Sequence, residues 1–176
     1  MKKMFFAVLV GAFILSSWIV LAEDRKLITS DEFVKKLSEQ PEKKSQQLRL
    51  RGLKNIKPRP PEVTVHVLFK FGSTKIADDF SQAQLDEAGK ALSCEVLSKY
   101  RFEIAGHTDS IGSTEFNLNL SQQRAKVIKK YLFEKYDISD KRLEVKGYGE
   151  SMPVGSNDTE TGRAKNRRVV FKRIDQ

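Results

Sequence analysis

The chain has 176 residues, of which 39% are hydrophobic and 31% are charged, and its formal net charge is +9. This length and composition are sufficient for one domain with a hydrophobic core and an additional tail. The single cysteine, Cys94, excludes an internal disulfide, so we interpret it as a small buried apolar side chain rather than as a link between two chains.

The first segment has the layout of a secretory signal. Lys2 and Lys3 precede an apolar stretch that carries no charge until Glu23. We expect residues 1–22 to be a signal peptide that is cleaved after Ala22, and without a cysteine near that position we expect no lipid attachment there. The alternative is a retained membrane anchor, because roughly 18 uncharged residues can span a bilayer.

Residues 23–61 are polar and end in a proline-rich stretch, which indicates a basic, proline-containing linker. One short helix is expected inside it, because Thr29 and Glu32 can form a capping box before apolar residues at helical spacing, namely Phe33, Val34 and Leu37. From Lys43 to Arg59 the chain is basic and contains no acid, so this stretch is either a solvated tether or an adhesive patch for an anionic membrane or wall surface. Nucleic acid is not the expected partner of an exported protein.

The region 62–176 is predicted to be the folded domain. Strict alternation of apolar and polar residues from Val63 to Phe71 predicts a half-buried strand. A helix should follow, with its apolar residues at a spacing of three or four: Leu85, Ala88, Leu92 and Val96. The second strand is expected from Arg101 to Ala105.

A long second helix is expected next, and its apolar stripe comprises Leu120, Val127, Ile128, Tyr131 and Leu132. Leu143 and Val145 mark a third strand, a polar loop runs from Pro153 to Asn166, and a last strand covers residues 169–171. The order strand, helix, strand, helix, strand, strand predicts an α+β sandwich. Its helices should pack on one face of a mixed four-stranded sheet.

Two charged residues are the candidates for a binding site. Asp109 lies where the second strand ends, and ligand sites commonly gather in the loops that leave strand ends. Arg124 shares a polar helix face with Asn117 and Ser121, about a third of a turn from the apolar stripe, so its head should be free to reach the rim of the sheet. Asp109 could bind the ammonium and Arg124 the carboxylate of a zwitterion, such as the free end of an amino acid.

Several blocks of this region, in order and at matching spacing, resemble the OmpA-like C-terminal domain: Gly106-His107-Thr108-Asp109, Asn117 to Ala125, Gly147-Tyr148-Gly149, Asn157 to Arg163, and Asn166 to Val169. The resemblance implies a periplasmic domain, associated with the cell wall or outer membrane, that binds peptidoglycan through meso-diaminopimelate of the stem peptide. It implies that Asp109 and Arg124 are the binding acid and base, with Thr108 and Asn117 as supporting contacts and no cofactor. Of Arg167 and Arg168, one should lie near the cleft and the other should face solvent, and Arg168 is a further candidate for the site.

Three other interpretations remain open. Asp109 and Arg124 could form a purely structural ion pair. The protein could be an interaction protein anchored in the inner membrane by its apolar N-terminal segment. It could also be a wall hydrolase using His107, Asp109 and Ser121, but the sequence has no G-x-S-x-G motif and no metal-ligand cluster, since it contains two histidines. We therefore predict a binding protein without catalytic residues or a metal site.

Overall fold

The computed structural model describes residues 25–40, 59–70 and 72–174. The expected signal peptide and almost all of the basic stretch from Lys43 to Arg59 lie outside these ranges; Arg59 itself is described and exposed. Within the described ranges, no helix combines the length and the apolar character needed to cross a membrane.

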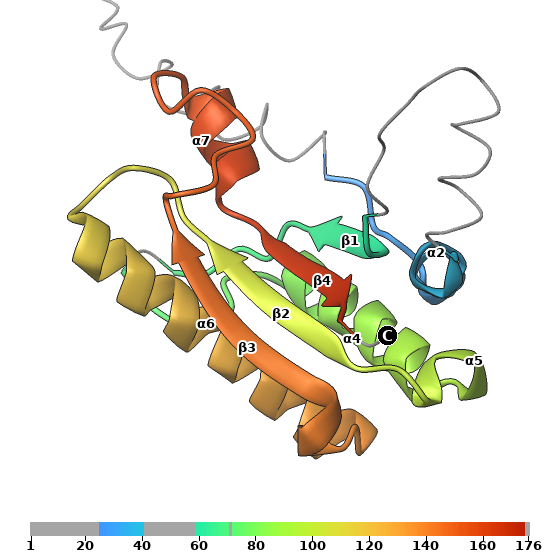
Figure 1. Ribbon diagram of the computed structural model, residues 1–176. Coiled ribbons are helices and arrows are strands. Elements are labelled where there is room, and N and C mark those ends of the chain that lie inside the picture. Colours follow the sequence, from blue (N-terminus) through green and yellow to red (C-terminus); the bar gives the residue numbers. More distant parts are fainter. Residues whose placement is uncertain (1–24, 41–58, 71, 175–176) are drawn as a thin grey trace, which may run out of the picture.

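A mixed sheet of four strands forms the centre of the described part (Figure 1). The strands are β1 (Glu62–Val65), β2 (Phe102–His107), β3 (Leu143–Gly149) and β4 (Val169–Arg173). Their order is β1-β4-β2-β3, with β2 and β3 parallel and the other neighbours antiparallel. The predicted α+β class with a mixed four-stranded sheet is confirmed.

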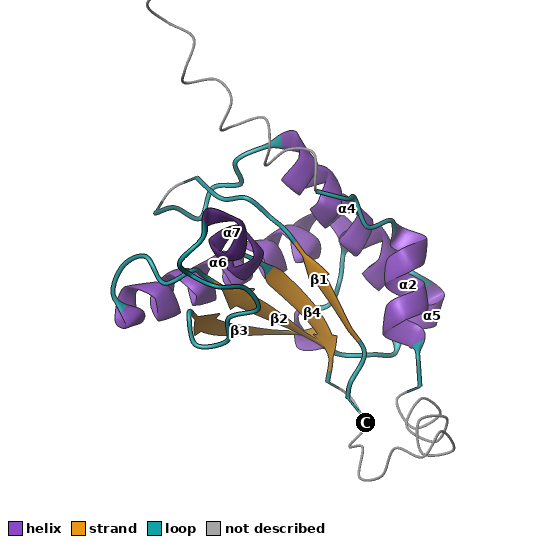
Figure 2. Cartoon of the chain, turned by 90° about the horizontal axis from the view of Figure 1, so that it is seen from above, coloured by secondary structure: helices purple, strands orange, loops and turns teal. Residues whose placement is uncertain are grey.

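Two long helices, α4 (Asp79–Ser93) and α6 (Thr114–Tyr136), pack on one face of this sheet (Figures 1 and 2). Shorter helical segments complete the fold: α2 (Ser30–Ser38), α5 (Glu95–Ser98), the 3-10 turn η1 (Asp140–Arg142) and α7 (Glu160–Asn166). Figure 1 shows α7 beyond the end of the sheet at which β2 and β3 terminate. The core between helices and sheet consists of fully buried apolar side chains that include Leu85, Leu92, Phe102, Ile104, Ile128, Leu132, Leu143 and Phe171.

The short helix α2 forms with the predicted Thr29–Glu32 capping box, but it is not part of a free linker. Phe33 and Leu37 are fully buried, and the ring of Phe33 meets the ring of Phe171 edge-on at a centroid distance of 5.8 Å. Figure 2 shows α2 beside α4 and α5. The assignment of residues 23–61 to a linker therefore needs a correction over residues 25–39, because an amphipathic helix too short to be stable alone is stabilised by packing on the domain.

Polar contacts also fix the chain that leads into α2. Arg25 forms an ion pair with Asp78 at 2.6 Å. The Gln84 side chain bonds both backbone groups of Ile28, accepting from its N–H at 2.9 Å and donating to its carbonyl at 3.0 Å. These bonds join the arm, residues 25–39, to the N-terminal half of α4.

The first strand is shorter than predicted. β1 ends at Val65, although Val67 is still buried, and Phe71 lies outside the described residues. The chain leaves the sheet because the backbone of Leu68 bonds elsewhere: its N–H donates to Ser81 Oγ at 2.8 Å, and its carbonyl accepts from Ala77 N at 2.9 Å.

The first long helix also ends earlier than its apolar pattern indicates. α4 stops at Ser93, and Cys94, which is partly buried against the core, caps both α4 and α5. The break changes the helical phase, so Val96 is 53% exposed and Leu97 is buried in its place. The inclusion of Val96 in the buried stripe was wrong for this reason.

The orientation of α6 differs from the prediction as well. Its buried residues are Asn117, Ser121, Ala125, Ile128 and Leu132, so the face that was expected to point away from the sheet partly lies against it. Glycines in the strands make this possible. A Cβ atom at Gly147 would lie 2.6 Å from Gln122 N, and one at Gly106 would overlap the carbonyl oxygen of Ser121.

Candidate functional site

The candidate site lies where β2 and β3 end and where α6 and α7 begin. Ser121 closes the contact between helix and sheet there, because its Oγ donates to Leu118 O at 2.8 Å and accepts from Gly149 N at 2.9 Å. Thr108 N donates to Gly149 O at 2.9 Å and holds the chain that leaves β2 against β3. This close packing fixes the starting point of the loop that carries Asp109.

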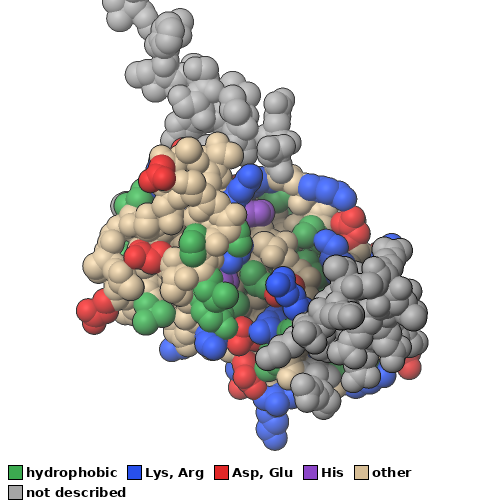
Figure 3. Space-filling model, turned by 45° about the horizontal axis from the view of Figure 1, so that its top comes forward, with side chains coloured by type: hydrophobic (Ala, Val, Ile, Leu, Met, Phe, Trp, Pro, Cys, Tyr) green, Lys and Arg blue, Asp and Glu red, His purple; other side chains and the backbone are tan. Residues whose placement is uncertain are grey.

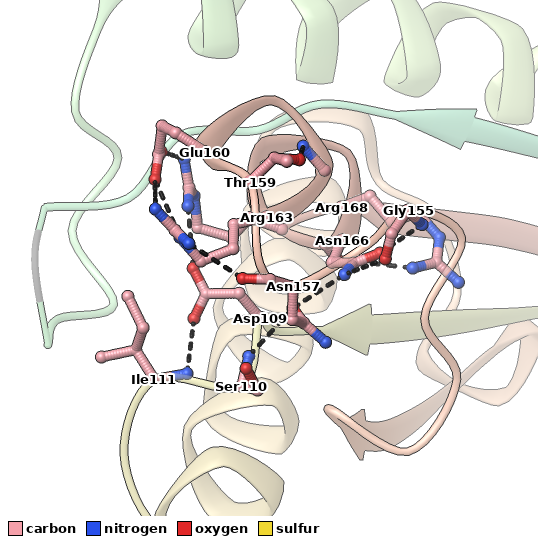
Figure 4. Close-up of polar contacts among 12 residues, drawn as sticks. Asp109, Ser110, Ile111, Gly155, Asn157, Thr159, Glu160, Arg163, Asn166 and Arg168 are labelled. Carbon is pink, nitrogen blue, oxygen red and sulfur yellow. Dashed lines mark hydrogen bonds and ion pairs between the residues drawn. The ribbon is translucent and has the colours of Figure 1, made fainter.

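Asp109 is buried, with 7% of its surface exposed, and both of its carboxylate oxygens are bonded. Oδ1 accepts from the backbone N–H of Ile111 at 3.2 Å, and Oδ2 accepts from Arg167 Nη1 at 2.8 Å. Figure 4 shows the side chain of Asp109 among Ile111, Asn157 and Glu160. A carboxylate held this way presents a fixed negative charge at the edge of the site.

Asn117 supports Asp109 through the backbone. Its Nδ2 donates to the carbonyl of Asp109 at 3.3 Å and to Glu150 Oε2 at 2.7 Å, and the residue is 2% exposed. The structure thus places Asn117 beneath the Asp109 loop, where it fixes the position of the acid.

Arg124 is half-buried, not free at the rim as the helical pattern indicated. Its Nε donates to Ser73 O at 3.1 Å, and its guanidinium carbon lies 4.8 Å from the centroid of the Phe69 ring. Burial lowers the pKa of Arg124, and the charge of Asp109 opposes this shift, so the two groups are near enough to influence each other. The guanidinium nevertheless stays protonated, as arginine does throughout the physiological range.

A small cavity of about 40 Å³ lies beside Arg124. Its lining contains basic and apolar groups: Val67, Leu68, Phe69, Gly106, His107, Arg124, Arg167, Arg168 and Val169. Figure 3 shows Lys, Arg and histidine side chains near one another in the middle of the face that it presents. Three guanidinium groups around one cavity favour an anionic group such as a carboxylate.

Both arginines at the start of β4 contribute to this region, which corrects the expectation that one of them would face solvent. Arg167 bonds Asp109 and, through Nη2, Glu160 Oε1 at 2.7 Å. Arg168 is 7% exposed and donates to the carbonyls of Met152, at 3.0 Å, and Asn166, at 3.4 Å. Alternation along the strand could not separate them, because the next two residues, Val169 and Val170, are both apolar and both buried.

The segment from Pro153 to Asn166, expected to be a polar loop, contains α7 and forms a hydrogen-bonded scaffold before β4. Asn166 Oδ1 accepts from the backbone N–H groups of Val154 and Gly155, and Asn157 Oδ1 accepts from Ser110 N at 3.2 Å. Figure 4 shows this network connecting the Asp109 loop to α7. The spacing of Glu160, Arg163 and Arg167 on one helical face is the sequence signal that could have revealed it.

Two buried polar atoms next to the site lack a hydrogen-bond partner in the described part of the chain: His107 Nδ1 and Thr108 Oγ1. The imidazole of His107 stacks on Tyr148 at a centroid distance of 5.1 Å, and burial lowers its pKa to about 4, so it is neutral at physiological pH. Since Asp109 bonds Arg167 and Ser121 bonds the backbone, no hydrogen-bonded relay joins His107, Asp109 and Ser121 among the described contacts. The described part of the chain contains no cluster of side chains able to hold a metal ion.

Comparison with known proteins assigns the chain to a family. The OmpA family profile matches residues 68–167. Outer membrane porin F of Pseudomonas fluorescens is 54% identical over 67 residues, which are 38% of this chain and only 20% of the porin. The chain thus spans about a fifth of the length of that curated relative.

Solved structures extend the comparison. The peptidoglycan-associated lipoprotein of Burkholderia pseudomallei has 30% identity and a TM-score of 0.53, over 61% of this chain and 88% of that one. The cell wall anchor of the type VI secretion system from Pseudomonas aeruginosa has 24% identity and a TM-score of 0.57, over 80% and 99% of the two chains, and this likeness concerns the fold alone. The chain belongs to the OmpA family.

Proposed function

We propose that this protein binds peptidoglycan non-covalently in the periplasm and thereby tethers itself to the cell wall or senses it. Peptidoglycan association is supported by the matched family and by the lipoprotein of Burkholderia pseudomallei, whose name describes that association. The ligand group is the free amino-acid end of diaminopimelate in the stem peptide, a zwitterion with one ammonium and one carboxylate.

The arrangement of Asp109 and Arg124 around Arg167 is the observation that carries the proposal. Arg167 bonds Asp109 and also lines the cavity beside Arg124, so one side chain connects the acid, which does not itself line the cavity, with the base that does. The ammonium of the ligand binds Asp109, and its carboxylate binds Arg124 within the basic cavity. Thr108 Oγ1 and His107 Nδ1, both buried and unpaired among the described residues, supply further polar contacts.

The strength of this binding is modest. One charge-assisted hydrogen bond contributes about 1.5 to 3 kcal/mol, and ordering the ligand opposes binding. A few such bonds give a dissociation constant on the order of micromolar to millimolar. Weak single sites suit a polymer that offers many copies of the same end group.

Sedimentation with insoluble peptidoglycan tests the proposal. The wild-type protein should pellet with the polymer, and Asp109→Asn and Arg124→Gln should stay in the supernatant while keeping their circular dichroism spectra. Asp158→Asn and Lys126→Gln are matched controls, because both side chains are exposed and lie outside the cavity. Equal pelleting of all five proteins contradicts the assignment of the site.

A further inference from the structure

The protein itself supplies a cation at the place where a ligand ammonium would bind. Arg167 Nη1 donates a hydrogen bond to Asp109 Oδ2, and the backbone N–H of Ile111 donates one to Oδ1. The side chain of Asp109 is 11% exposed and that of Arg167 30%, so solvent weakens this ion pair little. Each oxygen can accept a second hydrogen bond, so an incoming ammonium does not find Asp109 free but competes with these donors, and the side chain of Arg167 is the one that can move.

Arg167 has a second anchor that remains if its bond to Asp109 breaks. Its Nη2 donates to Glu160 Oε1 at 2.7 Å, and Glu160 lies at the start of α7. Because Arg167 also lines the cavity beside Arg124, a small rotation about the Glu160 contact would direct the released Nη1 into that cavity. A ligand carboxylate held by Arg124 would be its new partner there.

We propose that Arg167 determines the specificity of the site by competing with the ligand ammonium for Asp109 and by binding the ligand carboxylate once displaced. This inference rests on the proposed function and adds a selection rule to it. A ligand that carries an ammonium alone displaces Arg167 and gives it no replacement anion. A zwitterion supplies both groups, so the pocket selects α-amino-acid centres and rejects simple amines, including lysine side chains.

The charges around the cavity also favour a zwitterion over a simple amine. Arg124, Arg167 and Arg168 line the cavity, whereas Asp109 and Glu160 are the acids bonded to Arg167. Addition of a net positive ligand to this surplus of cations is unfavourable, and addition of a neutral zwitterion is not.

Calorimetric titration of the full-length protein with three related probes tests the inference. The probes are meso-diaminopimelate, 1,5-diaminopentane, which has the same chain without carboxylates, and pimelate, which lacks the amines. Wild-type protein should bind diaminopimelate at least tenfold more tightly than either partial analogue. Arg167→Gln should bind diaminopentane about tenfold better than wild type, as expected when one charge-assisted hydrogen bond no longer has to be broken. Its affinity for diaminopimelate should stay close to that of wild type, because removal of the competing cation and loss of the partner for the ligand carboxylate offset each other.

Arg163→Gln is the matched control. Arg163 lies on α7, which Arg167 caps at its C-terminus, and bonds the same acid, Glu160, but its other bond goes to the carbonyl of Asn157 and not to Asp109. The ratio of diaminopimelate affinity to diaminopentane affinity in Arg163→Gln should equal the ratio in wild type. Should Arg167→Gln fail to fold, Arg167→Lys keeps a competing charge without the planar fork and should show the same changes at smaller size.

Several outcomes separate failure of this inference from failure of the proposed function. If Arg167→Gln weakens all probes equally, or binds diaminopentane no better than wild type, while Asp109→Asn still abolishes diaminopimelate binding, the role of Arg167 is structural only and the inference is wrong. If wild-type protein does not bind diaminopimelate, or if Asp109→Asn binds it unchanged, the proposed function itself fails.

Discussion

Replacement of Phe33 by alanine should destabilise the protein strongly, although this residue lies well before the first strand. The ring is fully buried, meets Phe171 at an interplanar angle of 78°, and belongs to the same core as Leu85 and Phe102. Truncation of a buried phenylalanine to alanine costs about 3 to 5 kcal/mol. Since domains are stable by only about 5 to 15 kcal/mol, this loss would remove a large fraction of the stability.

Urea unfolding followed by circular dichroism measures the effect as a lower midpoint at an unchanged slope. Lys35→Ala is the matched control, because Lys35 lies on the same helix and is exposed, so its effect should stay within about 0.5 kcal/mol. If Phe33→Ala unfolds at the same urea concentration as Lys35→Ala, α2 does not contribute to the fold, and residues 25–39 are a tether after all.

Three further predictions concern the helices and the site. Gly147→Ala should lower stability by about 2 to 3 kcal/mol in the same urea assay, because its Cβ would lie 2.6 Å from Gln122 N and separate α6 from the sheet. Burial and a hydrogen bond to Asp86 raise the pKa of Tyr136 to about 12, so Asp86→Asn should shift tyrosine ionisation, followed by ultraviolet absorbance, towards lower pH. Burial lowers the pKa of His107 from 6.5 to about 4, so the unfolded chain binds a proton in this window that the folded chain does not, and stability should fall by up to about 3 kcal/mol between pH 6.5 and 4. This loss of stability should be smaller in His107→Gln. An equal loss in both proteins would show that His107 is not the group responsible.

The fold class was predictable because its main elements carry regular patterns. Phe102 and Ile104 lie on either side of the charged Glu103 in β2, and Ile128 and Leu132 repeat at helical spacing in α6. The ends of elements were less predictable, since side chains distant in sequence determine them. Ser81, for example, binds the backbone of Leu68 and turns the chain away from the sheet.

Part of the candidate site could also be predicted. The position of Asp109 directly after a strand, and of Arg124 on the following helix, was enough to expect both near one end of the sheet. The orientation of α6 was not predicted, because an apolar stripe indicates the buried face of a helix only when the opposing strands carry side chains at the contact. Here Gly106 and Gly147 leave room for backbone and Ser121, so a polar helix face packs against the sheet.

The pairing of Arg167 with Asp109 could not be predicted from the sequence, for a different reason. Residues separated by 58 positions meet because β4 pairs antiparallel with β2, which sets Val169 opposite Gly106 and the start of β4 beside the end of β2. The polar loop gave no apolar pattern from which this return could be inferred. Its hydrogen-bonding residues, among them Asn157 and Asn166, determine the geometry instead.

A nuclear magnetic resonance titration of isotopically labelled protein with meso-diaminopimelate tests the binding site most directly. Two groups of signals should move together and saturate at one concentration: the backbone amides from Thr108 to Gly112, and the side-chain Nε–H of Arg124. Shifts confined to another surface, or movement of one group without the other, would contradict a site in which Asp109 and Arg124 hold the same small molecule.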